Sequence, residues 1–204
     1  IRGIPLLEYW LKNLENSGCE SVLINTHYLS EQVELFLINR KKSAMKINTI
    51  YEKKLLGTAG TLKKNLKFFN NEIGLLIHAD NYSNLNIENL IDFHKNNKNN
   101  TILTMVTFFT NTPKNCGIVE VDSDNILIDF VEKPKIPKNN LANGAIYAFD
   151  LRFIKEFRNI VNVNDFSKDI IYKFKGRIQT YHTNKILIDI GNPHSLQKAC
   201  NTVF

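Results

Sequence analysis

The sequence predicts an α/β fold with a mixed, mostly parallel sheet. Over the first 109 residues, short apolar or β-branched runs alternate with stretches whose apolar residues share one helical face. Strands and helices that alternate at this spacing form βαβ units, whose strands run parallel. The pattern then changes to two strands joined by a short polar turn, which predicts an antiparallel hairpin.

The first half of the chain is expected to alternate helices and strands. Residues 5–17 predict a helix with Pro5 in its first turn and Gly18 as its stop. Ser30 and Asn86 are expected to cap two further helices, and the first of these is expected to bury Val33, Leu35, Phe36 and Leu37. Strands are expected at residues 21–25, 46–51, 74–79 and 101–109, a loop turning into a helix at 57–66, and a loop at 96–100.

The second half of the chain begins with the hairpin, in which residues 116–121 and 126–131 flank a turn at 122–125. No Pro/Gly-rich linker or internal repeat divides the chain, so residues 1–204 are expected to form one domain. Further strands are expected at residues 141–149, 177–182 and 185–188, and helices at 151–157, 166–174 and 193–203.

Composition and charge argue against a nucleic-acid-binding, disulfide-rich or membrane protein. The net charge is +6, but the 21 Lys and 5 Arg are scattered, and nucleic-acid binding needs a basic stripe or interleaved aromatic residues. The three cysteines are widely spaced, which indicates neither a disulfide framework nor a zinc site. The apolar runs are too short to cross a bilayer and no signal peptide opens the chain. We therefore expect a cytoplasmic protein that binds neither nucleic acid nor membrane.

Two aspartates follow predicted strands. Asp80 comes after the apolar run 75–77, and Asp189 comes after the run 186–188. Ligands of open α/β sheets bind at the carboxyl ends of the strands, and Mg²⁺ takes one or two carboxylates together with substrate phosphates. The alternative is that each aspartate caps the next turn.

Two further segments have residue types that suit a phosphorylated ligand. The turn at residues 57–60 (GTAG) lies between a strand and a helix, where small residues let backbone N–H groups approach a phosphate or a base. Glu132, Lys133 and Pro134 end the hairpin, with a lysine for phosphate and a carboxylate for hydroxyl groups. An ordinary helix start and an exposed strand end are the alternatives.

The combination of these segments is more specific than each alone. Six segments follow one another: LGTAG (56–60), HAD (78–80), CGIVE (116–120), EKP (132–134), NGAIY (143–147) and DIGNP (189–193). Over nearly the whole chain this order resembles the sugar-1-phosphate nucleotidyltransferases. LGTAG, NGAIY and DIGNP are most similar to the mannose-1-phosphate guanylyltransferase branch.

The resemblance implies a Rossmann-like nucleotidyltransferase fold and a Mg²⁺-dependent reaction of a nucleoside triphosphate with a sugar 1-phosphate. An oxygen of the sugar phosphate attacks the α-phosphorus, which gives a nucleotide-sugar and pyrophosphate. By this resemblance, Asp80 and Asp189 bind the metal and Lys133 contacts the sugar phosphate. In-line transfer needs positioning and charge neutralisation more than covalent help.

The same resemblance implies how the two substrates are held. Glu132 would contact the sugar hydroxyls, and Gly117 and Asn143 would line the sugar pocket. Leu56, Gly57 and Thr58 would lie beside the base and the ribose. The product implied is GDP-mannose or a related GDP-sugar for surface polysaccharide synthesis.

Three departures from the family pattern stand out. His78-Ala79 occupies the place where many relatives have Asn-Gly, and Leu187 replaces a common aromatic residue. The family's first strand and Gly-rich loop, on the order of 30 residues or about one βα unit, precede the segment that Ile4-Pro5 matches. We expect the natural protein to contain this unit, and the chain without it to show weak turnover or none. The neighbours of the absent strand should then have unpaired edges and exposed apolar surface.

Other functions stay open at this point. A nucleotidyltransferase could use UTP, dTTP or CTP with another sugar phosphate, and a non-catalytic paralogue could bind a nucleotide-sugar without turnover. Asp122 and Asp124 match the DxD pattern of metal-dependent glycosyltransferases, although between two strands they predict a hairpin turn. Assembly into a homo-oligomer is also open.

Overall fold

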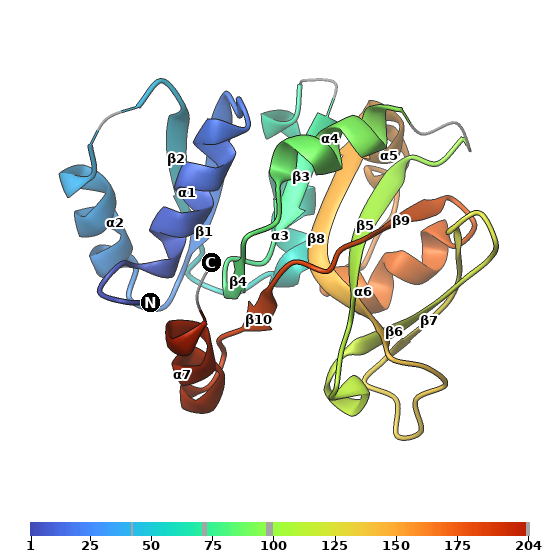
Figure 1. Ribbon diagram of the computed structural model, residues 1–204. Helices are drawn as coiled ribbons and strands as arrows, with labels where there is room; N and C mark the ends of the chain where they lie inside the picture. The colour runs from blue at the N-terminus through green and yellow to red at the C-terminus, as the bar shows by residue number, and fades with distance from the viewer. Residues whose placement is uncertain (42, 71–72, 97–99, 203–204) are drawn as a thin grey trace.

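The strands lie between two layers of helices in the computed structural model, which describes residues 1–41, 43–70, 73–96 and 100–202 (Figure 1). Helices α1 and α4 lie in front of the strands and α3 and α5 behind them. The helices are α1 (Leu6–Asn16), α2 (Ser30–Asn39), α3 (Gly57–Lys64), α4 (Ile87–Lys95), α5 (Leu151–Phe157), α6 (Phe166–Asp169) and α7 (Pro193–Asn201). The strands are β1 (Ser21–Thr26), β2 (Lys46–Tyr51), β3 (Ile73–Ile77), β4 (Asn81–Ser83), β5 (Leu103–Phe109), β6 (Gly117–Val121), β7 (Leu127–Glu132), β8 (Leu141–Asp150), β9 (Ile178–His182) and β10 (Leu187–Asp189).

Side chains of the central strands alternate between the two helical layers. In β5, Met105 packs into the core that α3 and α5 cover, whereas Val106 packs into the core beneath α1 and α4. In β8, Tyr147 packs into the core under α3 and α5, and Ile146 packs into the core beneath α1 and α4. A strand has a side-chain period of two, so apolar residues at successive positions produce one core on each face of the sheet.

The largest sheet has six strands, and β8 pairs with three of the other five. β8 pairs antiparallel with β5 along one edge and with β3 and β6 along the other, while β9 adds parallel to β5 and β7 antiparallel to β6. β1 pairs parallel with β2, and β10 pairs antiparallel with β4.

The mixed α/β class is confirmed, but fewer strand pairs are parallel than the sequence predicts. Two of the seven pairings among the described strands are parallel. The reason is that β8 follows the hairpin region without a crossover helix, and it runs antiparallel between β3 and β5.

Strands β1 and β3 each pair along one edge only. Among the described strands, β1 hydrogen-bonds to β2 alone and β3 to β8 alone. A cavity of about 1050 Å³ is lined by both strands and by α1, with Trp10, Val22, Ile24, Leu75 and Ile77 among its walls. All five residues of β3 are half-buried, although their sequence is that of a core strand. Both strands therefore have an open edge beside an apolar part of the cavity wall.

Two helical segments differ from their predictions. The cap of α2 is Leu29, which has a positive φ of 52°, and Ser30 is the first helical residue without a side-chain capping bond. Leu35, expected inside, is 61% exposed, whereas Val33, Phe36 and Leu37 are half-buried. The reason is helix geometry: Leu35 is two residues after Val33 and therefore lies about 200° round the helix from it. The helix expected at 166–174 is split into α6 and a 3₁₀ turn at Ile171–Phe174.

The other predicted elements agree with the structure to within a few residues, whereas β4 was not predicted. Asn86 caps α4 as expected, since its side-chain oxygen accepts a hydrogen bond from the amide of Asn89 at 2.9 Å. The central part of the loop expected at 96–100 and the predicted end of the last helix at residue 203 lie outside the described residues.

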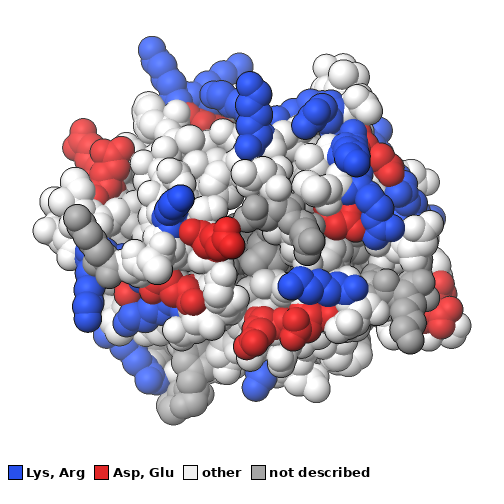
Figure 2. Space-filling view, turned by 90° about the horizontal axis from the view of Figure 1, so that it is seen from above, with Lys and Arg blue, Asp and Glu red and all other residues white. Residues whose placement is uncertain are grey.

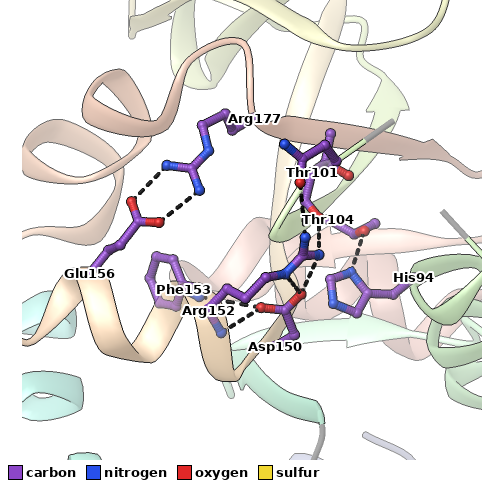
Figure 3. A network of polar contacts seen from close by, with 9 residues as sticks. His94, Thr101, Thr104, Asp150, Arg152, Phe153, Glu156 and Arg177 are labelled. Atoms are coloured by element: carbon purple, nitrogen blue, oxygen red, sulfur yellow. Dashed lines mark hydrogen bonds and ion pairs between the residues drawn. The ribbon is translucent and has the colours of Figure 1, made fainter. Parts of the chain in front are cut away.

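A polar network fixes the start of α5 at the sheet end opposite to the aspartates (Figure 3). Asp150 Oδ1 accepts hydrogen bonds from the amides of Arg152 and Phe153 at 2.7 and 3.3 Å. The Arg152 guanidinium donates hydrogen bonds to Asp150 Oδ2 and, at 2.7 Å, to the carbonyl of Thr101. Buried His94 pairs with Thr104 Oγ1 at 2.7 Å. This network joins α5, α4 and the start of β5.

Figure 2 shows basic and acidic side chains interspersed over one face of the molecule. This distribution matches the scattered lysines of the sequence. None of the helices in the described ranges is long and apolar enough to cross a lipid bilayer.

Candidate active site

Asp80 and Asp189 are brought together by a short antiparallel pair of strands. Asp189, the last residue of β10, lies opposite Asn81 of β4, and the amide of Ile190 donates to the carbonyl of Asp80 at 3.0 Å. Both aspartates are exposed. Asp189 Oδ1 accepts a hydrogen bond from the amide of Gly191 at 2.7 Å, as the turn-capping alternative required. This bond occupies one oxygen and fixes the carboxylate, so its second oxygen can serve a ligand.

His78 lies beside these carboxylates at the end of β3. Its ring nitrogen Nε2 is buried and has no hydrogen-bond partner among the described residues. Burial lowers the pKa of His78, and Asp80, Asp165 and Asp189 partly oppose that effect. A neutral ring with an unused nitrogen borders the cavity between β1 and β3.

The hairpin end presents Glu132 and Lys133 from one strand. Gly117 of β6 lies opposite Glu132 of β7, and a Cβ on Gly117 would be 2.7 Å from Glu132 Oε2. The absence of a side chain at position 117 therefore makes room for the carboxylate. Lys133 is exposed and has a positive φ of 47°, while its amide still donates to the carbonyl of Cys116 at 3.1 Å. A left-handed conformation costs free energy at a residue with a side chain, which marks this position as constrained.

Asn143 is held by its own strand. Its Oδ1 accepts from the amide of Ala145 at 3.0 Å, and its Nδ2 donates to the hydroxyl of Tyr147 at 2.7 Å. Ala145 has a positive φ of 53° beside an irregularity in the β5–β8 register. Burial raises the pKa of Tyr147 to about 12, so its hydroxyl is neutral near pH 7. Each polar atom of Asn143 keeps capacity for one further bond.

The LGTAG turn is clamped by the chain segment before α6. The amides of Ala59 and Gly60 donate to the carbonyl of Asn164 at 2.8 and 3.3 Å, and Thr58 Oγ1 accepts from the amide of Phe166 at 2.8 Å. Gly57 has a φ of 72°, and a Cβ there would overlap Asn164. The two glycines therefore serve close packing, and two of the N–H groups expected to meet a ligand are already used.

Electrostatic interactions show that the predicted residues lie near one another. Burial raises the pKa of the Cys116 thiol, and Glu132, Lys133 and Asp189 all act on it. Burial also raises the pKa of Glu132, with Asp165 raising it further and Lys133 lowering it. The end of β7 and the end of β10 therefore face one region, which also borders Asp165.

The donor set at Asp80 and Asp189 fits a magnesium ion. Both groups are exposed carboxylates, and one is held by a backbone amide. Mg²⁺ usually takes one or two carboxylates and completes its shell with water and phosphate oxygens. No cluster of three potential ligand side chains occurs in the described parts of the chain, so substrate oxygens would have to complete the shell.

Three contributors escaped the sequence prediction. They contact the predicted site residues but were not predicted as site residues themselves: Glu52 and Asn164 lie outside the quoted motifs, and Tyr147 was named only as the last residue of NGAIY. Glu52 follows the end of β2 directly, so the strand-end argument applied to the aspartates would also have selected it. The carbonyl of Asn164 acts through the backbone, which leaves no signal in residue type.

Local contacts account for two further features noted in the sequence. Asp122 Oδ1 accepts hydrogen bonds from the amides of Asp124 and Ile126, both at 2.9 Å, so this segment is the predicted hairpin turn. Leu187, at the position of a common aromatic residue, packs over Gly144, where a Cβ would be 2.8 Å from its Cδ1.

Comparison with known proteins gives the family. Residues 1–203 match the family model described as nucleotidyl transferase. The chain belongs to the nucleotidyl transferase family. Its fold is also that of HddC from Yersinia pseudotuberculosis, with a TM-score of 0.82 at 24% identity over 98% of this chain and 86% of that chain. A structure of HddC complexed with GMP-PN has a TM-score of 0.81 at 23% identity and covers the same shares.

The curated relatives of this nucleotidyl transferase chain are longer than it is. Glucose-1-phosphate adenylyltransferase of Clostridium acetobutylicum is 29% identical over 95% of this chain and 57% of its own length. The enzyme of the same name from Thermosipho africanus is 30% identical over 82% of this chain and 46% of its own length. A Sulfolobus acidocaldarius protein named "Putative mannose-1-phosphate guanyltransferase" is 26% identical over 97% and 54%. The chain thus spans about half the length of the curated relatives it matches.

Proposed function

We propose that the full-length protein joins a nucleoside triphosphate to a sugar 1-phosphate, giving a nucleotide-sugar and pyrophosphate. The observation that supports this most directly is the adjacency of Asp80 and Asp189, tied by the bond from Ile190 to Asp80. The LGTAG turn and Asp80 line one cavity, and Lys133 and Asp189 both act on Cys116. A triphosphate and a sugar phosphate can therefore meet at the two carboxylates.

Each predicted residue has a role in this reaction. Asp80 and Asp189 would hold Mg²⁺, which when bound neutralises charge on the phosphoryl oxygens. Lys133 orients the sugar phosphate so that one oxygen is in line with the α-phosphorus. A bond forms from that oxygen to the α-phosphorus, and the bond to the β-phosphate breaks, so that pyrophosphate leaves.

The sugar and the base are held on opposite sides of the carboxylates. Glu132 accepts hydrogen bonds from sugar hydroxyls, and Gly117 leaves the space that this carboxylate needs. Asn143, fixed by Tyr147, lines the same pocket. Leu56, Gly57 and Thr58 lie beside the base and ribose. In this proposal the enzyme acts in the cytoplasm.

GTP and mannose 1-phosphate are our first candidate substrates. Their support is the resemblance of LGTAG, NGAIY and DIGNP, together with the name of the Sulfolobus relative. ATP and glucose 1-phosphate are the second candidate pair, because the Clostridium and Thermosipho relatives are named glucose-1-phosphate adenylyltransferases.

We also propose that the natural protein supplies a strand to the cavity between β1 and β3. Both strands have an open edge there, and Val22, Ile24, Leu75 and Ile77 give the cavity apolar walls along these strands. A strand in this place would pair with both neighbours and make one continuous sheet. Intact-mass measurement of the natural gene product tests this, because a native polypeptide that begins at Ile1 would contradict it.

Pyrophosphate release from the full-length protein tests the activity. Each of the common nucleoside triphosphates is combined with a panel of sugar 1-phosphates, and one pair is expected to give turnover. Ligand binding without turnover for any pair would favour a non-catalytic paralogue. Consumption of a finished nucleotide-sugar in the absence of triphosphate would favour a glycosyltransferase.

A further inference from the structure

Glu52 is a buried carboxylate beneath the LGTAG turn. It is 2% exposed and directly follows β2. Its Oε1 accepts a hydrogen bond from Thr61 Oγ1 at 2.8 Å, and its Oε2 accepts from the amide of Leu56 at 3.1 Å and from Asn25 Nδ2 at 3.4 Å. The three donors come from the turn, from α3 and from β1, so one side chain joins three elements.

The three donors to this charge are neutral. No Lys or Arg forms an ion pair with Glu52 within the described ranges. Burying a carboxylate is costly unless hydrogen bonds replace its hydration, and a helix N-terminus adds a favourable partial charge. Leu56 is the cap residue of α3 and Thr61 lies in its second turn, so the carboxylate lies against the start of that helix.

The turn is also held from its other side. The carbonyl of Asn164 accepts from the amides of Ala59 and Gly60, so the N–H groups at both ends of the LGTAG segment have partners. In the described part of the chain, the amides of Gly57 and Thr58 are left without a backbone or side-chain acceptor. Both residues border the cavity that Asp80 also lines.

We propose that Glu52 is the positioning residue of the nucleotide site. Its bonds to Leu56 and Thr61 fix the turn so that the amides of Gly57 and Thr58 face the nucleotide. Glu52 itself stays buried and acts through the turn. This role rests on the proposed function, because it assigns the LGTAG turn to the nucleoside triphosphate.

The test compares Glu52→Gln with the wild-type full-length protein by steady-state kinetics. The amide keeps the shape but loses the charge and one acceptor oxygen. We expect the KM for the triphosphate to rise about tenfold, which corresponds to the loss of one charge-assisted bond. The KM for the sugar 1-phosphate should stay within about twofold, since the hydrogen bonds of Glu52 all lie on the nucleotide side.

Glu8→Gln is the matched control for a general loss of stability. Glu8 is a largely buried carboxylate that accepts from Arg40 at 2.6 Å and is not among the residues of either proposed substrate site. The Glu8→Gln variant should have a lower melting temperature but an unchanged ratio of the triphosphate KM to the sugar 1-phosphate KM. The proposal is wrong if Glu52→Gln leaves that ratio unchanged, whether or not both values rise together.

Thr61 provides a second test if Glu52→Gln does not fold. Thr61→Ser keeps the hydroxyl donor and should keep the wild-type KM, whereas Thr61→Val removes it and should raise the triphosphate KM. Equal KM values for these two variants would overturn the proposal.

Direct titration separates this proposal from the proposed function. If the wild-type protein turns over no substrate pair, the Kd values of GTP and ATP are measured instead. A Kd that rises about tenfold in Glu52→Gln supports the positioning role without catalysis. Unchanged affinity, or no nucleotide binding by the wild-type protein, contradicts it.

Discussion

Gly117 and Glu132 face each other across the β6–β7 hairpin, and a Cβ on Gly117 would lie 2.7 Å from Glu132 Oε2. The same Cβ would lie 2.5 Å from the ring of Phe130. A methyl group at this position must therefore displace both side chains. We expect Gly117→Ala to raise the KM for the sugar 1-phosphate and to lower stability by about 1–3 kcal/mol through overpacking. Steady-state kinetics and urea unfolding measure the two effects.

The control for this prediction is Gly176→Ala. Gly176 has a φ of 79°, and a Cβ added there would meet no described heavy atom within 4 Å, so an alanine adds backbone strain without a clash. It should lower stability and leave the sugar phosphate KM unchanged. If Gly117→Ala kept the wild-type KM, Glu132 would not be a sugar contact.

The stability of the protein should fall on mild acidification because of His94. Burial lowers the pKa of His94 below its ordinary value of 6.5, while Asp150 partly raises it. A lowered pKa in the fold means that folding favours the neutral ring. That stabilisation is present above about pH 6.5 and is lost as the pH falls toward the folded-state pKa.

Melting temperatures at about pH 7.5 and about pH 5.5 measure this effect. His94→Asn keeps a polar atom toward Thr104 but removes the titrating ring, so its melting temperature should fall less between these values. His78, whose pKa is also lowered by burial, accounts for part of the remaining fall. An equal fall in the wild type and in His94→Asn would rule out His94 as a cause.

The capping role of Asp150 predicts a stability loss far from the proposed site. Asp150→Ala removes the acceptor for the amides of Arg152 and Phe153 and should cost about 0.5–2 kcal/mol (Figure 3). Asp150→Asn retains a capping oxygen and should cost less. Urea unfolding compares the two, and identical losses would show that the cap does not depend on this oxygen.

The sequence predicted most of the elements because local signals and tertiary packing agree. Asn86 lies before a stretch with one apolar face, and it caps α4 as predicted. The prediction for Leu35 failed because Leu35 lies about 200° round α2 from Val33 and so does not share its face, although both are apolar. The expectation of a mostly parallel sheet failed because strand direction depends on the connections between strands, and the residue pattern of a strand is the same in either direction.

The candidate site was predictable where side chains determine it. Asp189 ends β10 and Asp80 follows the end of β3, so their residue type and position pointed to one edge. The clamp on the LGTAG turn was not predictable, because the carbonyl of Asn164 is a backbone group that every residue has. Glu52 was accessible to the same strand-end rule that selected the two aspartates.

The most direct test of the account is pyrophosphate release by the full-length protein with Asp80→Asn. This change keeps the size of the side chain and removes its charge, so we expect the rate with the preferred substrate pair to fall at least about 100-fold. Asp124→Asn, in the exposed hairpin turn, is the matched control and should keep the wild-type rate. An unchanged rate in Asp80→Asn, or a loss confined to Asp124→Asn, would contradict the assignment of the reaction to the Asp80–Asp189 pair.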